Sequence, residues 1–539
     1  MTRSDPARPW RVLNAVALML IVGAGLGLRL WNLTFGLPDW YHPDEPIKVR
    51  QIVRMVEGDL RPDSLYHPTF MLYAAAGMMR VMQAAGWSLN EQTAVRAGRL
   101  TVALLGAATV PLTCLAGRAL GGPFVGLVAA MLLAVAPLHV VCSHYLKEDV
   151  PMTFWAVATF LACLRITRCG GRWSCALGGL LAGVTAGTKY VGLLFVALPW
   201  LAYREWTHSV ANTAGLSDRR VRASPRHPVS SAHGVQPSNC PRTVWLASAV
   251  GFLVVTPYAL LDLPRFLLGF GHESGKVFTG MAGIAVSPLA YLWTYHLRYS
   301  ILPGIGLLPA VLAAWGFVLA LRRPDPAPRL LTVIIAVLYT VFESSPYKPP
   351  PNADRYVVPM LPFLAILAAD ALNELRARAP SGRWLARLLV TFAVAIPLAD
   401  ATRITASMNS DTRHRARDWL LQHACGADRI LLEGALNVGG ALVPSYAPAL
   451  PGRCQATYTY SLEWEQQRIK EYDVVVVTSF MYDRFLRFDS APAEARRFYE
   501  GFFATHEPAA EFQPTYRSYG FHQPTIRIYR LRGPRPVQP

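Results

Sequence analysis

Two adjacent carboxylates, Asp44 and Glu45, stand just beyond the first long apolar segment of the chain. A carboxylate held at a membrane edge and shielded from bulk water could act as a general base on an acceptor that arrives from the aqueous side. The same residues also suit the start of a helix, because acidic side chains favour a helix N-terminus and Pro46 favours its first turn. Taken alone, the pair supports the catalytic and the structural interpretation equally.

The composition indicates a membrane protein. Of the 539 residues, 53% are hydrophobic and only 16% are charged, whereas a soluble chain carries about a quarter charged residues. The formal net charge of +18 could suggest nucleic-acid binding, but the arginines lie between apolar segments and not on one basic surface. We therefore attribute them to membrane topology and lipid contacts, and expect no nucleic-acid partner.

The apolar segments predict a polytopic helical domain, residues 1–399, with about eleven spans and the N-terminus inside. The first outer loop, residues 32–99, is polar, and residues 69–87 within it are expected to form a helix at the membrane interface. A basic stretch, residues 204–243, is expected to be a cytoplasmic and largely disordered loop. The expected spans are residues 12–31, 100–120, 124–141, 151–164, 175–187, 191–203, 244–261, 301–321, 330–342, 357–372 and 385–398.

From residue 400 to residue 539 the composition becomes that of a soluble domain. Helical spacing at residues 411–423 and strand patterns at residues 429–433, 472–478 and 525–531 predict a small α/β domain on the outer face.

The eight cysteines show no metal-binding spacing. Only Cys425 and Cys454 are expected to be able to pair. Cys175 lies beside an apolar segment, where cysteine behaves as a small hydrophobe.

The predicted topology brings three charged outer loops to one face. Carboxylates there could deprotonate an acceptor or hold a divalent cation, and Lys and Arg could bind a phosphate. Charges are also expected in any solvated loop, so each residue taken singly has a structural explanation more often than a functional one. The residues are Asp44 and Glu45, then Lys147, Glu148 and Asp149, then Lys348, Asp354 and Arg355.

The order of these features resembles the GT-C membrane glycosyltransferases. More narrowly, residues 12–398 look like the bacterial branch of the protein O-mannosyltransferase and aminoarabinose-transferase group, glycosyltransferase family 39. Residues 411–419 look like the helix that opens that group's extracytoplasmic domain. The resemblance rests on the carboxylate pair and on three motifs in order: Gly58-Asp59-Leu60-Arg61-Pro62, Tyr66-His67-Pro68 and Gly187-Thr188-Lys189-Tyr190.

The resemblance implies a fold and a reaction. A sugar would pass from a polyprenyl phosphate to a protein, lipid or polysaccharide acceptor, with inversion, on the extracytoplasmic face of a bacterial inner membrane. Asp44 would be the base, with Glu45 and Asp149 as further catalytic candidates. Substrate-binding candidates are Lys147, Glu148, Lys348, Tyr356 and His67, together with Lys189 and Arg355, which are the best placed for the phosphate.

One motif departs from the family pattern. Aminoarabinose transferases carry Glu-Lys-Pro where this chain has Tyr66-His67-Pro68, so His67 cannot be assumed to replace the lysine. A neutral imidazole could ligate a metal or hydrogen-bond the phosphate. A divalent cation is therefore a possible cofactor, with Glu45, His67 and Glu148 as candidate ligands.

Two other classes of protein compete with a transferase. A transporter or flippase of lipid-linked sugars would also need many spans, but it predicts internal repeats and charges at mid-membrane depth. A scaffolding subunit would explain the outer domain but not the converging charged loops.

Overall fold

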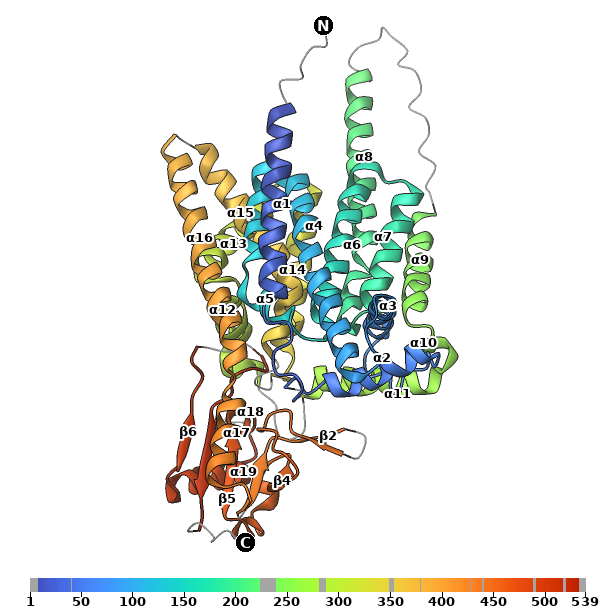
Figure 1. Ribbon diagram of the computed structural model, residues 1–539. Coiled ribbons are helices and arrows are strands. Elements are labelled where there is room, and N and C mark those ends of the chain that lie inside the picture. Colours follow the sequence, from blue (N-terminus) through green and yellow to red (C-terminus); the bar gives the residue numbers. More distant parts are fainter. Residues whose placement is uncertain are drawn as a thin grey trace.

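The structure is a computed structural model that describes residues 8–39, 41–222, 239–280, 287–348, 353–378, 380–426, 428–438, 441–487, 491–516 and 520–532. Long helices form a bundle, and the C-terminal part forms a compact sheet-containing domain at one end of it (Figure 1).

The number of helices that could cross a membrane differs from the eleven expected. Within the described ranges, six helical segments are long and apolar enough, or seven if one pair bent by 106° counts as a single span. Two predicted spans, α7 (Arg172–Ala186) and α9 (Cys240–Val255), have only 15 and 16 residues, fewer than the roughly 20 that a bilayer requires. The six are Val12–Leu30, Glu91–Ala134, Asp149–Cys169, Pro326–Ser344, Asp354–Arg378 and Pro380–His423; the bent pair is Leu297–Ile305 with Leu307–Arg322.

Helix α4 (Glu91–Ala134) is a hairpin of two helices. Gly121 and Gly122 have non-helical dihedrals, and Gly122 has φ 84°, a region that favours glycine. A Cβ on Gly117 would lie 3.1 Å from the Cα of Gly126. Nine helical residues would separate these positions by about 13 Å, so the chain reverses between them, where the sequence predicts a break between two spans.

The helices of the bundle begin and end as follows. The first half contains α1 (Arg8–Leu30), α4, α5 (Pro137–Cys142), α6 (Asp149–Cys169), α7 and α8 (Leu198–Arg222). The second half contains α9, α12 (Leu302–Ile305), α13 (Leu307–Arg322), α14 (Pro326–Ser344), α15 (Leu361–Arg378) and α16 (Pro380–Ser407). Helix α8 corrects the expectation of a disordered loop from residue 204, because the helix continues to Arg222; residues 223–238 lie outside the described residues.

Short helices gather on the side of the bundle that carries the C-terminal domain. Figure 1 shows α2 (Glu45–Glu57) and α11 (Leu263–Thr279) lying across the ends of the long helices. Helix α3 (Phe70–Ala84) follows α2 and packs against it, and α10 (Tyr258–Leu261) precedes α11.

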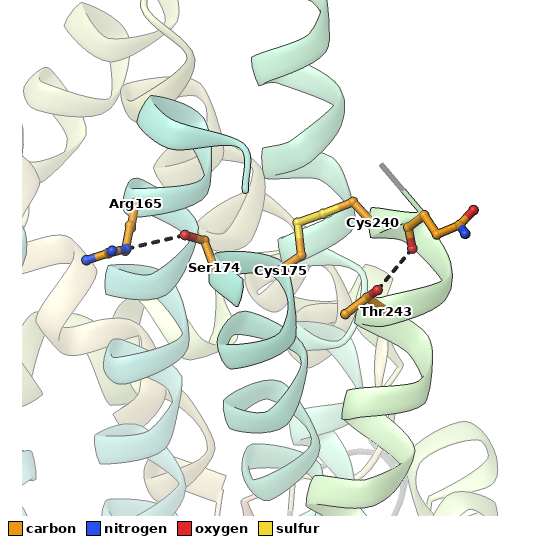
Figure 2. Close-up of a disulfide and its surroundings, with 6 residues drawn as sticks. Arg165, Ser174, Cys175, Cys240 and Thr243 are labelled. Carbon is orange, nitrogen blue, oxygen red and sulfur yellow. Dashed lines mark hydrogen bonds between the residues drawn. A yellow bond between two sulfur atoms is a disulfide. The ribbon is translucent and has the colours of Figure 1, made fainter. Parts of the chain in front are cut away.

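Cys175 and Cys240 form a disulfide that the sequence did not predict, because Cys175 was expected to be a free apolar side chain. Figure 2 shows the bond joining the first turns of α7 and α9. The two helices touch through their backbones: a Cβ on Gly183 would lie 2.0 Å from the Ser248 carbonyl oxygen. This close approach brings the cysteine Cα atoms to 5.9 Å, within the range that a disulfide requires.

The C-terminal domain is a three-layer α/β unit. Its sheet has the order β4-β1-β5-β7-β6, in which β4, β1 and β5 are parallel to one another and β7 is antiparallel to both of its neighbours, β5 and β6. Successive strand residues point to opposite faces: Val474 and Val476 pack with α17, and Val475 and Val477 with α18 and α19. The bounds are α17 (Thr412–His423), α18 (Ser479–Leu486), α19 (Ala493–Thr505), β1 (Arg429–Glu433), β4 (Gln455–Thr459), β5 (Val474–Thr478), β6 (Ala510–Phe512) and β7 (Ile526–Arg530).

These elements agree with the predicted helix and strands of the tail. A separate hairpin, β2 (Leu436–Val438) with β3 (Ala441–Val443), lies outside the main sheet. The predicted Cys425–Cys454 disulfide is present. The division of the chain at residue 400 stays a prediction, since α16 continues to Ser407 and α17 begins at Thr412.

Candidate active site

Asp44 precedes the first turn of α2 but makes no side-chain capping hydrogen bond. Its Oδ2 atom lies 2.7 Å from Lys147 Nζ and 3.6 Å from Arg355 Nη1, and its side chain is 35% exposed. Burial raises the pKa of Asp44. The positive charges of Lys147 and Arg355 outweigh this effect, so the pKa of Asp44 lies well below its usual range. Asp44 is therefore an ionised carboxylate in reach of solvent, and its side chain does not cap the helix.

A second carboxylate lies on the other side of Arg355. Asp149, the first residue of α6, forms an ion pair with Lys189 and lies 3.8 Å from Arg355 Nε. The Tyr356 ring lies 4.8 Å from Lys189 Nζ and 5.9 Å from the guanidinium of Arg355. Lys189 and Arg355 thus lie close together, around one aromatic ring and one carboxylate. Two side chains that bind the same phosphate must be close in this way.

The guanidinium of Arg355 has unfilled donors. Its Nε and Nη1 atoms are buried and have no hydrogen-bond partner in the described part of the chain, because the nearest carboxylate oxygens are too distant for a hydrogen bond. A buried donor without a partner costs free energy. An anion between Arg355 and its neighbours would supply the missing acceptor.

Lys48 is a site residue to which the sequence analysis assigned no role. It donates a hydrogen bond to Glu148, which also lies 3.4 Å from Lys147 Nζ. Burial raises the pKa of Glu148, but the two lysines lower it well below its usual range. The sequence spacing could have identified Lys48, because it follows Asp44 by four residues and side chains four residues apart lie on the same side of a helix.

Glu45 does not act where the sequence placed it. Its side chain is fully buried, and its oxygens accept hydrogen bonds from Arg99 Nε at 2.8 Å and Arg99 Nη2 at 2.7 Å. The backbone N–H of Leu146 donates a third bond to it at 3.0 Å. These three bonds hold the carboxylate away from the cavity that Asp44 lines, and we therefore expect Glu45 to have a structural role.

Lys348 is also outside the cluster. Its buried ammonium donates to the carbonyl oxygens of Glu343, at 2.9 Å, and Ser345, at 2.6 Å. Glu343 lies in the last turn of α14, and Ser345 is the residue that follows the helix. Lys348 therefore caps the C-terminal end of α14.

The three candidate metal ligands do not converge on one site: His67 and Glu148 line the same cavity, but Glu45 does not. Glu45 is bound to Arg99, and Glu148 to Lys48 and Lys147. Burial lowers the pKa of His67 to about 4, so its imidazole is neutral at physiological pH. Among the residues whose placement is described, no group of three or more His, Cys, Asp or Glu could hold a metal ion.

Two cavities meet at His67, Glu273 and Lys276. The first, of about 290 Å³, is polar and reaches Asp44 and Glu148. The second, of about 280 Å³, lies between α11 and α14 and reaches Lys189 and Tyr356 through mainly apolar side chains. A molecule with a polar head and an apolar tail could occupy both.

The C-terminal domain packs on the segment that precedes Asp44. The Phe521 ring lies 4.2 Å from the His42 ring and the His42 ring 4.8 Å from that of Tyr145, measured between centroids. Tyr145 Oη accepts from the Phe521 N–H at 3.2 Å and is hydrogen-bonded to His522 Nδ1 at 3.0 Å. His42 Nδ1 in turn accepts from the backbone N–H of Asp44 at 3.2 Å. The loop that carries Phe521 therefore holds the segment that positions the candidate base.

Comparisons with known proteins agree with this architecture. Residues 69–272 match the family described as dolichyl-phosphate-mannose-protein mannosyltransferase. ArnT from Cupriavidus metallidurans, solved bound to undecaprenyl phosphate, is 16% identical over 97% of this chain and 98% of its own, with a TM-score of 0.53. AglB, the archaeal oligosaccharyltransferase from Archaeoglobus fulgidus, in complex with an inhibitory peptide and a dolichol-phosphate, is 11% identical over 96% of this chain and 75% of its own, with a TM-score of 0.54.

These structural likenesses show the GT-C fold: a multi-pass helical membrane domain followed by a small C-terminal α/β domain. No curated protein matches the chain. The resemblance to the GT-C glycosyltransferases, and within them to the protein mannosyltransferase group, is confirmed.

The ion pair of Glu45 with Arg99 predicts that Glu45→Gln lowers stability more than it impairs chemistry. Breaking a buried pair by neutralising one partner costs roughly 3–5 kcal/mol. Thermal unfolding in detergent should show this loss, whereas Glu57→Gln, exposed at the end of the same helix, should change stability by less than about 0.5 kcal/mol. Glu45→Gln combined with Arg99→Met should recover part of the loss. A Glu45→Gln protein that is fully stable but inactive would restore the catalytic assignment.

The Phe521 contacts predict that Phe521→Ala lowers turnover, with a smaller loss of donor affinity because the Phe521 ring also lies 5.6 Å from the guanidinium of Arg355. The substitution frees the His42 ring and, through it, the backbone of Asp44, and a misplaced base costs roughly 10-fold to 100-fold in rate. Phe502→Ala is the matched control, because Phe502 is equally buried in the same domain but packs on the far side of its sheet. Equal losses in both variants would mean that only the stability of the domain matters.

Proposed function

We propose that the protein transfers a sugar from a polyprenyl-phosphate donor to an acceptor, with inversion, and that Asp44 is the general base. The observation that carries the proposal is the state of Asp44: ionised, in reach of solvent, uninvolved in capping and beside a guanidinium with unfilled donors. The acceptor, whether protein, lipid or polysaccharide, would approach from the side of the C-terminal domain.

A lipid-linked donor fits the two connected cavities. The mainly apolar cavity between α11 and α14 would take the first prenyl units, and its inner end would place the phosphate at Lys189, Arg355 and Tyr356. The sugar would then extend into the polar cavity beside Asp44. The undecaprenyl phosphate of ArnT and the dolichol-phosphate of AglB support this class of donor.

The proposed reaction needs one proton transfer and one displacement. Asp44 takes the proton of the acceptor nucleophile, the nucleophile forms a bond to the anomeric carbon, and the bond between that carbon and the phosphate oxygen breaks. The electron pair leaves with the phosphate. Arg355 and Lys189 would stabilise the charge that develops on it.

Arg355 would also link donor binding to the base. It lies between Asp44 and Asp149 and lowers the pKa of Asp44. A phosphate that engages Arg355 would weaken its contact with Asp44, so the pKa of Asp44 would rise toward that of a more effective base. The carboxylate would then gain basicity when a donor is bound.

We further propose a bacterial inner membrane, with the site and the C-terminal domain outside. The arginine-rich ends of α8, α15 and α16 lie at the end of the bundle away from the C-terminal domain (Figure 1), and an excess of arginine is typical of the cytoplasmic side. The likeness to bacterial ArnT over nearly the full length of both chains is consistent with this assignment.

The sharpest test is Asp44→Asn. Asparagine caps helices about as well as aspartate but cannot accept the proton, so turnover should fall by about 10²-fold or more with normal expression and donor binding. Radiolabelled sugar transfer in proteoliposomes measures turnover. Asp63→Asn, an exposed surface carboxylate, is the control. Full activity of Asp44→Asn would reject the mechanism and favour a transporter of lipid-linked sugars.

The phosphate assignment predicts that Arg355→Gln and Lys189→Gln weaken use of the donor more than use of the acceptor. A lost charge-assisted hydrogen bond costs roughly 1.5–3 kcal/mol, which corresponds to about 10-fold to 150-fold in kcat/KM for the donor. Lys348→Gln, whose ammonium caps α14, should leave the donor KM unchanged. Unchanged donor kinetics in both site variants would show that the phosphate binds elsewhere.

A further inference from the structure

A third cavity lies between α15 and α16. These two helices meet at the end of the bundle opposite the C-terminal domain (Figure 1). The cavity has a volume of about 750 Å³, and Arg376, Arg378, Arg383 and Arg387 line it. Phe124 and Asn373 are also in its wall, and the described lining contains no carboxylate. Four cations therefore share one cavity with no negative charge in its wall.

The end of α15 and the start of α16, which carry these arginines, pack closely together. A Cβ on Gly382 would lie 2.3 Å from the Leu375 carbonyl oxygen, so the two helix ends touch through their backbones. Gly382 and Ala386 are buried against α15. Arg383 follows Gly382, and Arg387 follows Ala386. Because the two arginines are four residues apart, they lie on the same face of α16, next to the face that packs on α15.

Aromatic rings hold three of the four guanidinium groups without neutralising them. Arg376 lies 4.5 Å from the centre of the Phe124 ring, Arg387 lies 5.1 Å from that of Trp384, and Arg378 lies 5.8 Å from that of Trp315. Within the described ranges, Arg376, Arg383 and Arg387 have no carboxylate within ion-pair distance, and only Arg378 has one, Glu374 at 3.6 Å. The rings position the cations for an external anion.

Several other arginines at this end of the bundle have protein partners. Arg168 Nη2 donates to the Ala119 carbonyl at 2.6 Å, and Arg323 Nη1 to Asp370 at 2.7 Å. Arg165 Nε donates to Ser174 Oγ at 3.3 Å, as Figure 2 shows. Arginines that only set the membrane topology must lie on this side of the membrane, but they need not gather in one cavity. The convergence at α15 and α16 therefore needs another explanation.

The surface beside the cavity is apolar. On α16, Trp384 is 72% exposed and Leu388 is 54% exposed, and an exposed tryptophan near charged residues is typical of a membrane interface. A ligand with its charge in the cavity could lay acyl chains along these side chains. A free inorganic anion would make no use of them.

We propose that this cavity binds the phosphate headgroup of an anionic phospholipid from the adjacent leaflet. Arginine offers paired N–H donors to phosphate oxygens, and basic pockets between helices at this side of a membrane bind anionic headgroups. The site is separate from the transfer reaction, because the arginine cavity and the Asp44 cluster lie at opposite ends of the bundle (Figure 1). The lipid would cross-brace the ends of α4, α15 and α16.

The test compares lipid binding by two triple variants with equal loss of charge. Arg376→Gln/Arg383→Gln/Arg387→Gln alters the cavity, and Arg172→Gln/Arg204→Gln/Arg322→Gln alters exposed arginines that do not line it. Native mass spectrometry of the purified full chain titrated with phosphatidylglycerol or phosphatidylcholine gives the affinities. The first triple variant should lose phosphatidylglycerol affinity on the order of 100-fold, about fivefold per arginine; the second should match the unsubstituted protein.

Equal losses in the two triple variants would reject the site in favour of a diffuse charge effect. Displacement of phosphatidylglycerol by inorganic phosphate at equal concentration would reject the lipid as the ligand, and retention against phosphate supports it. Should the first triple variant fail to fold, Arg383→Gln alone, whose guanidinium contacts no ring or carboxylate among the described residues, should still lose affinity about fivefold. An unchanged affinity in that variant would overturn the proposal.

Discussion

The buried ion pair of Glu45 with Arg99 joins segments that are distant in the sequence. Arg99 Nη1 also donates to the carbonyl oxygens of Leu33 and Phe35, at 2.9 Å and 2.8 Å, after the end of α1. Glu45 in turn accepts from the backbone of Leu146, in the loop before α6. One pair thus fixes the first outer loop, α2, α4 and the second charged loop against each other. With Glu45 committed to this connection, Asp44 is left at the surface of the cavity, where its side chain pairs with Lys147 and lies near Arg355.

This division between neighbouring carboxylates explains what the sequence could predict and what it could not. The order of charged loops and apolar segments was sufficient to predict a GT-C-like fold, a sheet-containing tail and the approach of Asp44 to Lys147 and Arg355. Lys189 lies close by but pairs with Asp149. The roles of Asp44 and Glu45 could not be separated, because both are acidic and adjacent. Their difference arises from Arg99, fifty-four residues further along, and from the direction in which the α2 backbone turns each side chain.

Other errors have the same physical origin, contacts that depend on packing in three dimensions. Cys175 was expected to be a free apolar side chain because no spacing relates it to Cys240, yet backbone contact between α7 and α9 brings the two within bonding distance. Lys348 has the same charge as Lys147 but caps a helix end. Phe521 carries no local signal, and only the docking of the C-terminal domain places it on His42.

The charges at the site are close to balance, and the proposed reaction preserves that balance. Asp44, Glu148 and Asp149 face Lys48, Lys147, Lys189 and Arg355, which leaves an excess of one positive charge. A sugar linked through a phosphodiester to a polyprenol carries one negative charge and would neutralise it. When the sugar leaves, the phosphate becomes a monoester with nearly one further negative charge, while the proton from the acceptor neutralises Asp44. Total charge inside the site then stays constant from bound donor to bound product. A buried cluster that never has to accommodate a net change in charge can stay rigid through the reaction, which is the condition under which fixed cations stabilise a developing charge most effectively.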